Sequence, residues 1–114
     1  MKEKSQLELM VVYQDIELMI NEAEEEQNSA GFNVEGMDNL EKALDDISEK
    51  IAQQNLRLYY RLKKKFNRPI VPVRNDICLG CFAKQPSSYR AKAANDQTIM
   101  TCEQCGRILF LIGY

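Results

Sequence analysis

The residues best suited to chemistry are four cysteines, which form two C-x2-C pairs: Cys78 with Cys81, and Cys102 with Cys105. Twenty residues separate the pairs, and the chain of 114 residues has no other cysteine. Thiolate sulfur is a favoured ligand of Zn²⁺, and four such ligands complete a tetrahedral structural site. Each short turn can bring two sulfurs to one ion. The spacing therefore predicts a structural Zn²⁺ site with these four ligands.

The same thiols suit two other kinds of site, a redox dithiol and an iron or iron–sulfur centre. A redox C-x-x-C pair of thioredoxin type would lie in a βαβ unit, which neither pair has around it. A catalytic zinc keeps a position for water, and four cysteines leave none. Histidine, the commonest general base, is absent from the sequence. With no phosphate loop or nucleophile elbow either, we expect a protein that is not an enzyme.

The elements that must position the cysteines lie in residues 68–114, which we expect to form a separate unit. Two prolines and β-branched residues predict an extended segment over residues 69–75. A short helix is expected over residues 86–94, and strands over residues 98–101 and 107–112. Gly80 and Gly106 fit turns that a side chain would crowd or that need a positive φ. A unit of about 45 residues has only a marginally stable hydrophobic core, and a bound metal ion would supply the additional stabilisation.

Residues 1–67 are predicted to form an antiparallel two-helix coiled-coil hairpin: a helix over about 5–27, a turn over 28–36 and a helix over about 37–67. Apolar residues repeat at alternating steps of three and four in both helices. The first set is Leu9, Val12, Ile16, Met19 and Ala23, and the second is Met37, Leu40, Leu44, Ile47 and Ile51. An antiparallel register sets Val12 opposite Ile51 and Met19 opposite Leu44, with its midpoint at Gly31–Phe32. Pro69 should end the second helix at residues 67–68.

The first helix is apolar beyond this single stripe, and a two-helix hairpin cannot bury all of its side chains. The residues outside the stripe are Leu7, Met10, Val11, Tyr13, Leu18 and Ile20. Two explanations stay open. The cysteine-containing unit folds back and covers some of them, or two hairpins join in a four-helix bundle, which would make the protein a homo-oligomer through its helical stalk.

Charge divides the chain into an acidic and a basic part. Residues 1–55 hold fourteen acidic residues against four lysines, and residues 56–114 hold eleven basic residues against three acidic ones. Arg57, Arg61, Lys64 and Arg68 recur at i, i+4, i+7 and i+11, on one face of the predicted second helix. Lys63 and Lys65 lie beside them. Further basic residues occur in the cysteine-containing unit: Arg74, Lys84, Arg90, Lys92 and Arg107.

Basic residues interleaved with aromatic ones are typical of nucleic-acid binding, particularly to single-stranded RNA or DNA. The aromatic residues near these cations in the sequence are Tyr59, Tyr60, Phe82 and Tyr89. Two alternatives stay open, a protein partner and a purely electrostatic role at the helix C-terminus or against the acidic stalk. We take Arg57, Arg61, Lys64, Arg68, Arg74 and Arg107 as candidate contact residues for nucleic acid or a partner.

The cellular location is predicted from what the sequence lacks. Acidic side chains interrupt the apolar stretch near the N-terminus, so this stretch does not resemble a signal peptide. No apolar run approaches the roughly 18 residues that a membrane span requires. We therefore expect a cytoplasmic protein with no membrane association, where thiols stay reduced and available to metal.

The cysteine-containing unit resembles the bacterial C4-type zinc ribbon protein family. The resemblance covers about residues 69–112 and lies in Val71-Pro72-Val73, Cys78-x-Gly80-Cys81-Phe82 and Ile99-x-Thr101-Cys102-x-x-Cys105-Gly106-Arg107-Ile108-Leu109-Phe110. It implies a coiled-coil hairpin followed by a zinc ribbon, the four cysteines as metal ligands, and a nucleic-acid-binding or transcription-linked regulatory role. The stalk is shorter than is usual in that family.

A second resemblance is to coiled-coil, four-cysteine regulators that enter the secondary channel of RNA polymerase. Those proteins present acidic residues at the hairpin tip, where this chain offers Glu35 and Asp38. The alternative function that we consider is a protein-interaction adaptor that acts through the extra apolar residues of the helical hairpin, on RNA polymerase or a sigma factor. The cysteine spacing and the Val-Pro-Val segment fit the first family better.

Overall fold

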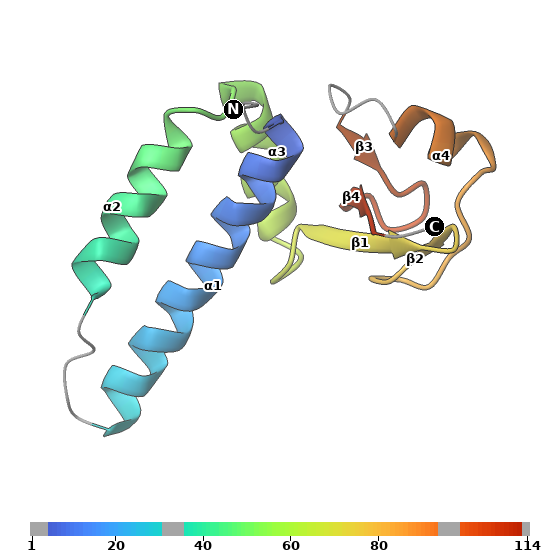
Figure 1. Cartoon of the computed structure of the whole chain (residues 1–114). Helices are drawn as coiled ribbons and strands as arrows, with labels where there is room; N and C mark the ends of the chain where they lie inside the picture. The colour runs from blue at the N-terminus through green and yellow to red at the C-terminus, as the bar shows by residue number, and fades with distance from the viewer. Residues whose placement is uncertain (1–4, 31–35, 94–98, 113–114) are drawn as a thin grey trace.

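The computed structural model describes residues 5–30, 36–93 and 99–112, which form an α plus small β fold (Figure 1). Long helices make up the N-terminal part, and a small sheet with a short helix makes up the C-terminal part. The elements are α1 (Gln6–Ala30), α2 (Met37–Ser48), α3 (Gln53–Lys63), β1 (Ile70–Arg74), β2 (Ile77–Cys78), α4 (Ser88–Ala93), β3 (Met100–Thr101) and β4 (Ile108–Leu111). This confirms the predicted class.

The helices depart from the prediction in two ways. α1 continues to Ala30, beyond the predicted end at residue 27, while the midpoint of the expected pairing at Gly31–Phe32 lies outside the described residues. The single second helix over 37–67 is wrong. α2 ends at Ser48, and α3 is a separate helix that ends at Lys63. α1 and α2 run side by side in opposite directions, and α3 crosses beside the N-terminal half of α1 (Figure 1).

The break between α2 and α3 is held by a side chain from α1. Gln6 Oε1 accepts hydrogen bonds from the backbone N–H of Ala52 at 2.8 Å and from the Asn55 amide at 3.0 Å, and Gln6 Nε2 donates to the Lys50 carbonyl at 2.9 Å. Ala52 has an extended backbone, with φ −59° and ψ 139°. Because Gln6 satisfies backbone groups that a helix end leaves free, the chain can turn here at low cost.

The main core forms where α1, α3 and the sheet meet. Its buried residues are Met10, Tyr13, Ile51, Tyr59, Ile70 and Ile108. The predicted stripe on α1 is therefore only partly confirmed: Ala23 is buried, but Met19, expected to face Leu44, is 50% exposed, and Met10, outside the stripe, is 1% exposed. The face of α1 that bears Met10 and Tyr13 is covered by α3 and the sheet of the same chain, as the first explanation for its extra apolar residues requires.

The sheet has four strands in the order β2-β1-β4-β3. The central pair, β1 and β4, is parallel, with Ile70 opposite Ile108 and Val73 opposite Leu111. β2 and β3 add antiparallel edges of two residues each. These observations confirm the extended segment at 69–75 and the last strand. Residue 98 of the predicted third strand lies outside the described part of the chain.

A buried glutamine joins the sheet to α1. Gln14 Oε1 accepts the backbone N–H of Ile70 at 2.8 Å, and Gln14 Nε2 donates to the carbonyl of the same residue at 3.0 Å. The side-chain amide thus pairs with Ile70 as a neighbouring strand would, and it satisfies both backbone groups at the start of β1. Among the described residues, no helix combines the length and the apolarity that crossing a bilayer would take.

Candidate metal centre and basic surface

The four cysteine sulfurs gather at one point, with all Sγ atoms within 4.8 Å of one another. Cys78 Sγ and Cys105 Sγ are 4.0 Å apart, and Cys81 Sγ and Cys102 Sγ are 3.6 Å apart. Around a tetrahedral Zn²⁺ with Zn–S bonds of about 2.3 Å, neighbouring sulfurs lie about 3.8 Å apart. A disulfide would need about 2.05 Å. The cluster therefore fits one metal ion, as the spacing predicted.

The sheet order brings the two cysteine pairs together. Cys78 is the last residue of β2, and Cys102 directly follows β3, so each pair extends from an edge strand. The parallel pairing of β1 with β4 places both edges in one sheet. Cys78 and Cys102 are buried, while Cys81 and Cys105 are half-buried. The strands fix the position of the ligands, and a bound ion would in turn tie together strands that are only two residues long.

Hydrogen bonds to Cys102 favour its thiolate. Burial opposes ionisation, but the backbone N–H groups of Cys105 and Gln104 and the side-chain amide of Gln85 outweigh it and lower the pKa of the Cys102 thiol to about 6. Gln104 N lies 3.4 Å and Gln85 Nε2 3.3 Å from Cys102 Sγ. Gln85 was not predicted from the sequence. It is buried and lies between the first cysteine pair and α4, but no motif distinguished it from other glutamines.

The pKa values of the Cys78 and Cys105 thiols are shifted in the opposite direction. Burial is the main cause, and the neighbouring sulfurs add to it: the pKa of Cys78 is raised, and that of Cys105 is raised to about 12. Four thiolates in this small volume would repel one another without a cation. A bound Zn²⁺ would supply that cation and displace the thiol protons.

Both glycines singled out in the sequence serve the turns around the sulfurs. Gly106 has φ +82°, the left-handed region where a side chain is strained. A Cβ on Gly80 would lie 3.0 Å from the Arg107 guanidinium and 3.2 Å from a Val71 methyl group. Gly106 is therefore needed for its backbone conformation, and Gly80 is needed for close packing. Each of the two predicted reasons applies to one glycine.

Arg107, a candidate contact residue, is partly buried and engaged within the chain. Its guanidinium carbon lies 4.1 Å from the centroid of the Phe66 ring, and its Nη2 donates to the Gly80 carbonyl at 3.4 Å. It therefore links the segment after α3 to the first cysteine turn. This arrangement leaves Arg107 less able than an exposed cation to reach a phosphate.

The other candidate contact residues are exposed, but they do not form one helix face. Arg57 and Arg61 are one turn apart on α3, and Lys64 is its C-cap. Because α3 ends at Lys63, Arg68 lies in the segment that leads to β1. The prediction that Arg68 shares a helix face with Arg57 and Arg61 is therefore wrong. Arg74 ends β1. The basic surface therefore consists of a helical part and separate cations near the sheet.

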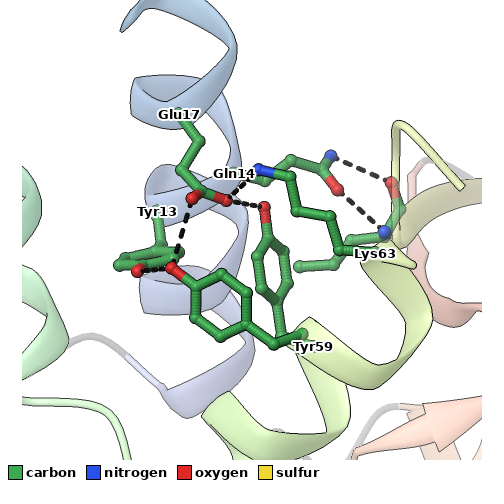
Figure 2. A network of polar contacts seen from close by, with 7 residues as sticks. Tyr13, Gln14, Glu17, Tyr59 and Lys63 are labelled. Carbon is green, nitrogen blue, oxygen red and sulfur yellow. Dashed lines mark hydrogen bonds and ion pairs between the residues drawn. The ribbon is translucent and has the colours of Figure 1, made fainter. Parts of the chain in front are cut away.

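Lys63 faces inward instead of joining this surface. Its Nζ lies 2.6 Å from Glu17 Oε1 on α1, and the Tyr59 hydroxyl donates to the same oxygen at 2.6 Å (Figure 2). The Tyr60 hydroxyl donates to Glu17 Oε2 at 3.2 Å and shares a hydrogen bond with Tyr13. The network fastens α3 to α1, and neither Lys63 nor the buried Tyr59 is free to contact nucleic acid.

The tyrosine network predicts a loss of stability in alkali. Burial, then the hydrogen bond to Glu17 and its charge, raise the pKa of Tyr59 well above its usual value. In the unfolded chain this hydroxyl ionises at about pH 10, so the stabilisation is complete below that pH and falls as the pH rises further. Each such tyrosine contributes a slope of about 1.4 kcal/mol per pH unit. Urea unfolding of the zinc-saturated protein across this range measures it.

Tyr59→Phe removes one ionising group from the network. The alkaline slope of the unfolding free energy should become shallower by about 1.4 kcal/mol per pH unit, while stability near neutral pH falls because a hydrogen bond to Glu17 is lost. Tyrosinate absorbance recorded in parallel shows whether the remaining tyrosines ionise only on unfolding. Parallel slopes for the two proteins would refute the linkage.

Comparison with known proteins found similarity at the level of the structure. No family model and no curated protein sequence matches the chain. The structure is similar to that of CT398 from Chlamydia trachomatis, with a TM-score of 0.58 and 25% identity over 68% of this chain, and to that of HP0958 from Helicobacter pylori, with a TM-score of 0.60 and 27% identity over 70% of this chain. The matched part spans 34% of either of those proteins, about one third of their length.

Proposed function

We propose that the chain is a non-enzymatic regulator that binds single-stranded RNA or DNA, built as a helical coiled-coil hairpin followed by a C-terminal zinc ribbon. Zn²⁺ held by the four cysteines has a structural role. The observation that carries the proposal is the pair of exposed arginines Arg57 and Arg61, one turn apart on α3 and followed by exposed Lys64. Side chains one turn apart project from the same helix face, as phosphate-binding residues must.

Separate cations extend this surface toward the sheet. Arg68 and Arg74 are exposed on either side of the buried start of β1. Aromatic side chains available for stacking are fewer than the sequence indicated, since Tyr59 and Tyr89 are buried and Phe82 and Tyr60 are exposed. We therefore assign phosphate binding to α3 and the segment after it, in a cytoplasmic protein.

A protein-interaction adaptor is the alternative, and one observation favours it. Met19 is half exposed at the middle of α1, on a helix that contacts both α2 and the sheet through its other faces. Such a side chain suits a partner helix, from RNA polymerase, from a sigma factor or from a second copy of this chain in a homo-oligomer. In this alternative the acidic residues of α2 face the partner.

The discriminating experiment measures salt-dependent binding of a fluorescent single-stranded RNA. The double variant Arg57→Glu/Arg61→Glu should bind about tenfold more weakly or worse at low salt. Its plot of log K against log salt should be shallower by about 0.7 for each phosphate that the variant no longer neutralises.

The matched control is Lys42→Glu/Lys50→Glu, which makes the same change in net charge at exposed positions in or just after α2. A specific phosphate-binding face predicts a clearly smaller effect for this control. Equal reductions in affinity for the two variants would mean that overall charge alone governs binding. Absence of any binding by the unaltered protein at ~50 mM salt, where binding to phosphates is strong, would contradict the proposal and leave the adaptor.

A further inference from the structure

Phe82 occupies a backbone position that an aromatic residue rarely adopts. It directly follows the first cysteine pair and has φ +66°. Gly106 takes the equivalent place after the second pair, with φ +82°. In both turns the backbone N–H of this residue donates to the carbonyl of the first cysteine, Phe82 to Cys78 at 2.6 Å and Gly106 to Cys102 at 2.9 Å. Glycine would therefore suffice for the conformation and the hydrogen bond of this turn, whereas a bulky residue at this position has a strained backbone.

The fold gains little from the ring that imposes this strain. Phe82 is 72% exposed, the largest exposed fraction among the large hydrophobic side chains of the described residues. Leu79, on the same turn, is 39% exposed. Because burial of the ring does not offset this backbone strain, the ring is better explained by a role in function than by a role in stability.

Two cations lie beside this turn on one face of the sheet. Ile77 of β2 pairs with Arg74 on one side and with Lys84 on the other. Residues directly opposite one another in antiparallel strands project to the same face, so Arg74 and Lys84 flank Ile77 in one row. Both cations are exposed, and Lys84 follows Phe82 by two residues. This row borders the turn that carries Phe82, and exposed aromatic rings combined with exposed cations are typical of surfaces that bind unpaired bases and their phosphates.

We propose that Phe82 is a stacking platform for an unpaired base of single-stranded nucleic acid, with Arg74 and Lys84 contacting the adjoining phosphates. This inference rests on the proposed function and names the part of the surface that receives a base. Every base has a π-face that can stack on an aromatic ring, so binding would show little sequence preference.

The test uses the zinc-loaded full chain and a single-stranded oligonucleotide that carries a fluorescent adenine analogue, whose emission falls when it stacks. Phe82→Gly removes the ring and also relieves the backbone strain, so this variant should fold and resist denaturant at least as well as Phe82→Ala. Its affinity should fall roughly 5- to 100-fold, the quenching should disappear and the salt dependence should stay unchanged. Phe82→Tyr should restore both affinity and quenching.

The outcomes separate this inference from the proposed function. Full affinity and quenching in Phe82→Gly would overturn the stacking platform, while the salt dependence and its reduction in Arg57→Glu/Arg61→Glu would still support nucleic-acid binding. No binding by the unaltered protein would overturn both. Restoration by Phe82→Leu as complete as by Phe82→Tyr would also overturn stacking, because it would show that apolar bulk suffices, as in a pocket on a protein partner.

Discussion

Loss of the metal should unfold the sheet and α4 while α1 and α2 stay helical. Structural zinc sites of this kind contribute on the order of 10 kcal/mol of apparent folding free energy. Two of the four strands are only two residues long, and they carry the cysteine pairs. Without the ion, the two edges are joined through the pairing of β1 with β4 and through single long hydrogen bonds from Gln85 and Arg107.

The measurement combines chelation of the native protein with the substitution Cys105→Ser or Cys78→Ser. Near-ultraviolet circular dichroism and protease resistance of residues 68–114 should be lost, whereas most far-ultraviolet helical signal should persist. Re-addition of Zn²⁺ should restore the chelated protein and leave the variants unfolded. Leu79→Ser is the matched control, because Leu79 is an exposed residue of the same turn and supplies no thiolate. A chelated protein that kept its protease resistance would show that the metal is dispensable.

Gln14→Leu should be the most destabilising substitution outside the metal site that leaves every cysteine in place. The replacement has a similar size, but it leaves the N–H and the carbonyl of Ile70 without the partners that they have now. An unsatisfied buried backbone group costs about 1–3 kcal/mol, so the two together predict a loss of roughly 2–6 kcal/mol. The loss should appear as a lower urea midpoint for the zinc-saturated protein.

The control for this substitution is Gln54→Leu, which makes the same chemical change at an exposed position of α3 and should alter stability by less than about 0.5 kcal/mol. Because Gln14 contacts the first residue of β1, its loss should also increase hydrogen exchange at Ile70 and the neighbouring strand residues. Equal urea midpoints for the two variants would mean that water replaces the amide and that the joint between α1 and the sheet contributes little.

The metal site was predictable because its information is local. Two C-x2-C turns limit where four sulfurs can lie, and β-branched residues and prolines over residues 69–75 exclude a helix. The structure accordingly places Cys78, Cys81, Cys102 and Cys105 within reach of one ion. Gly80 and Gly106 were also identified from the turn chemistry. The hydrogen bond from Gln85 to Cys102 and the conformation of Phe82 were not predicted. Nothing local indicates that an aromatic residue adopts the same positive φ as Gly106.

The helical part was less predictable because its outcome depends on contacts between distant residues. The apolar repeat slips by about one position beyond Ile51, which predicts local unwinding of a supercoil and not the end of a helix. The helix nevertheless breaks there, because Gln6 binds that segment from more than forty positions away. The same repeat placed Met19 in the interior, whereas α3 and the sheet select the face with Met10 and Tyr13. Lys63, expected among the exposed cations, instead pairs with Glu17.

The sequence by itself determined the ligand set, the strands around it and the division of charge, since these follow from residue types and short spacings. Only the tertiary structure decided which cations stay exposed, where the second helix breaks, and that Gln14 joins β1 to α1. The physical reason is that the position of a polar side chain depends on the group to which it is hydrogen-bonded or paired. Gln6, Gln14 and Glu17 each satisfy groups at least forty positions away in the chain, and no local pattern specifies that choice.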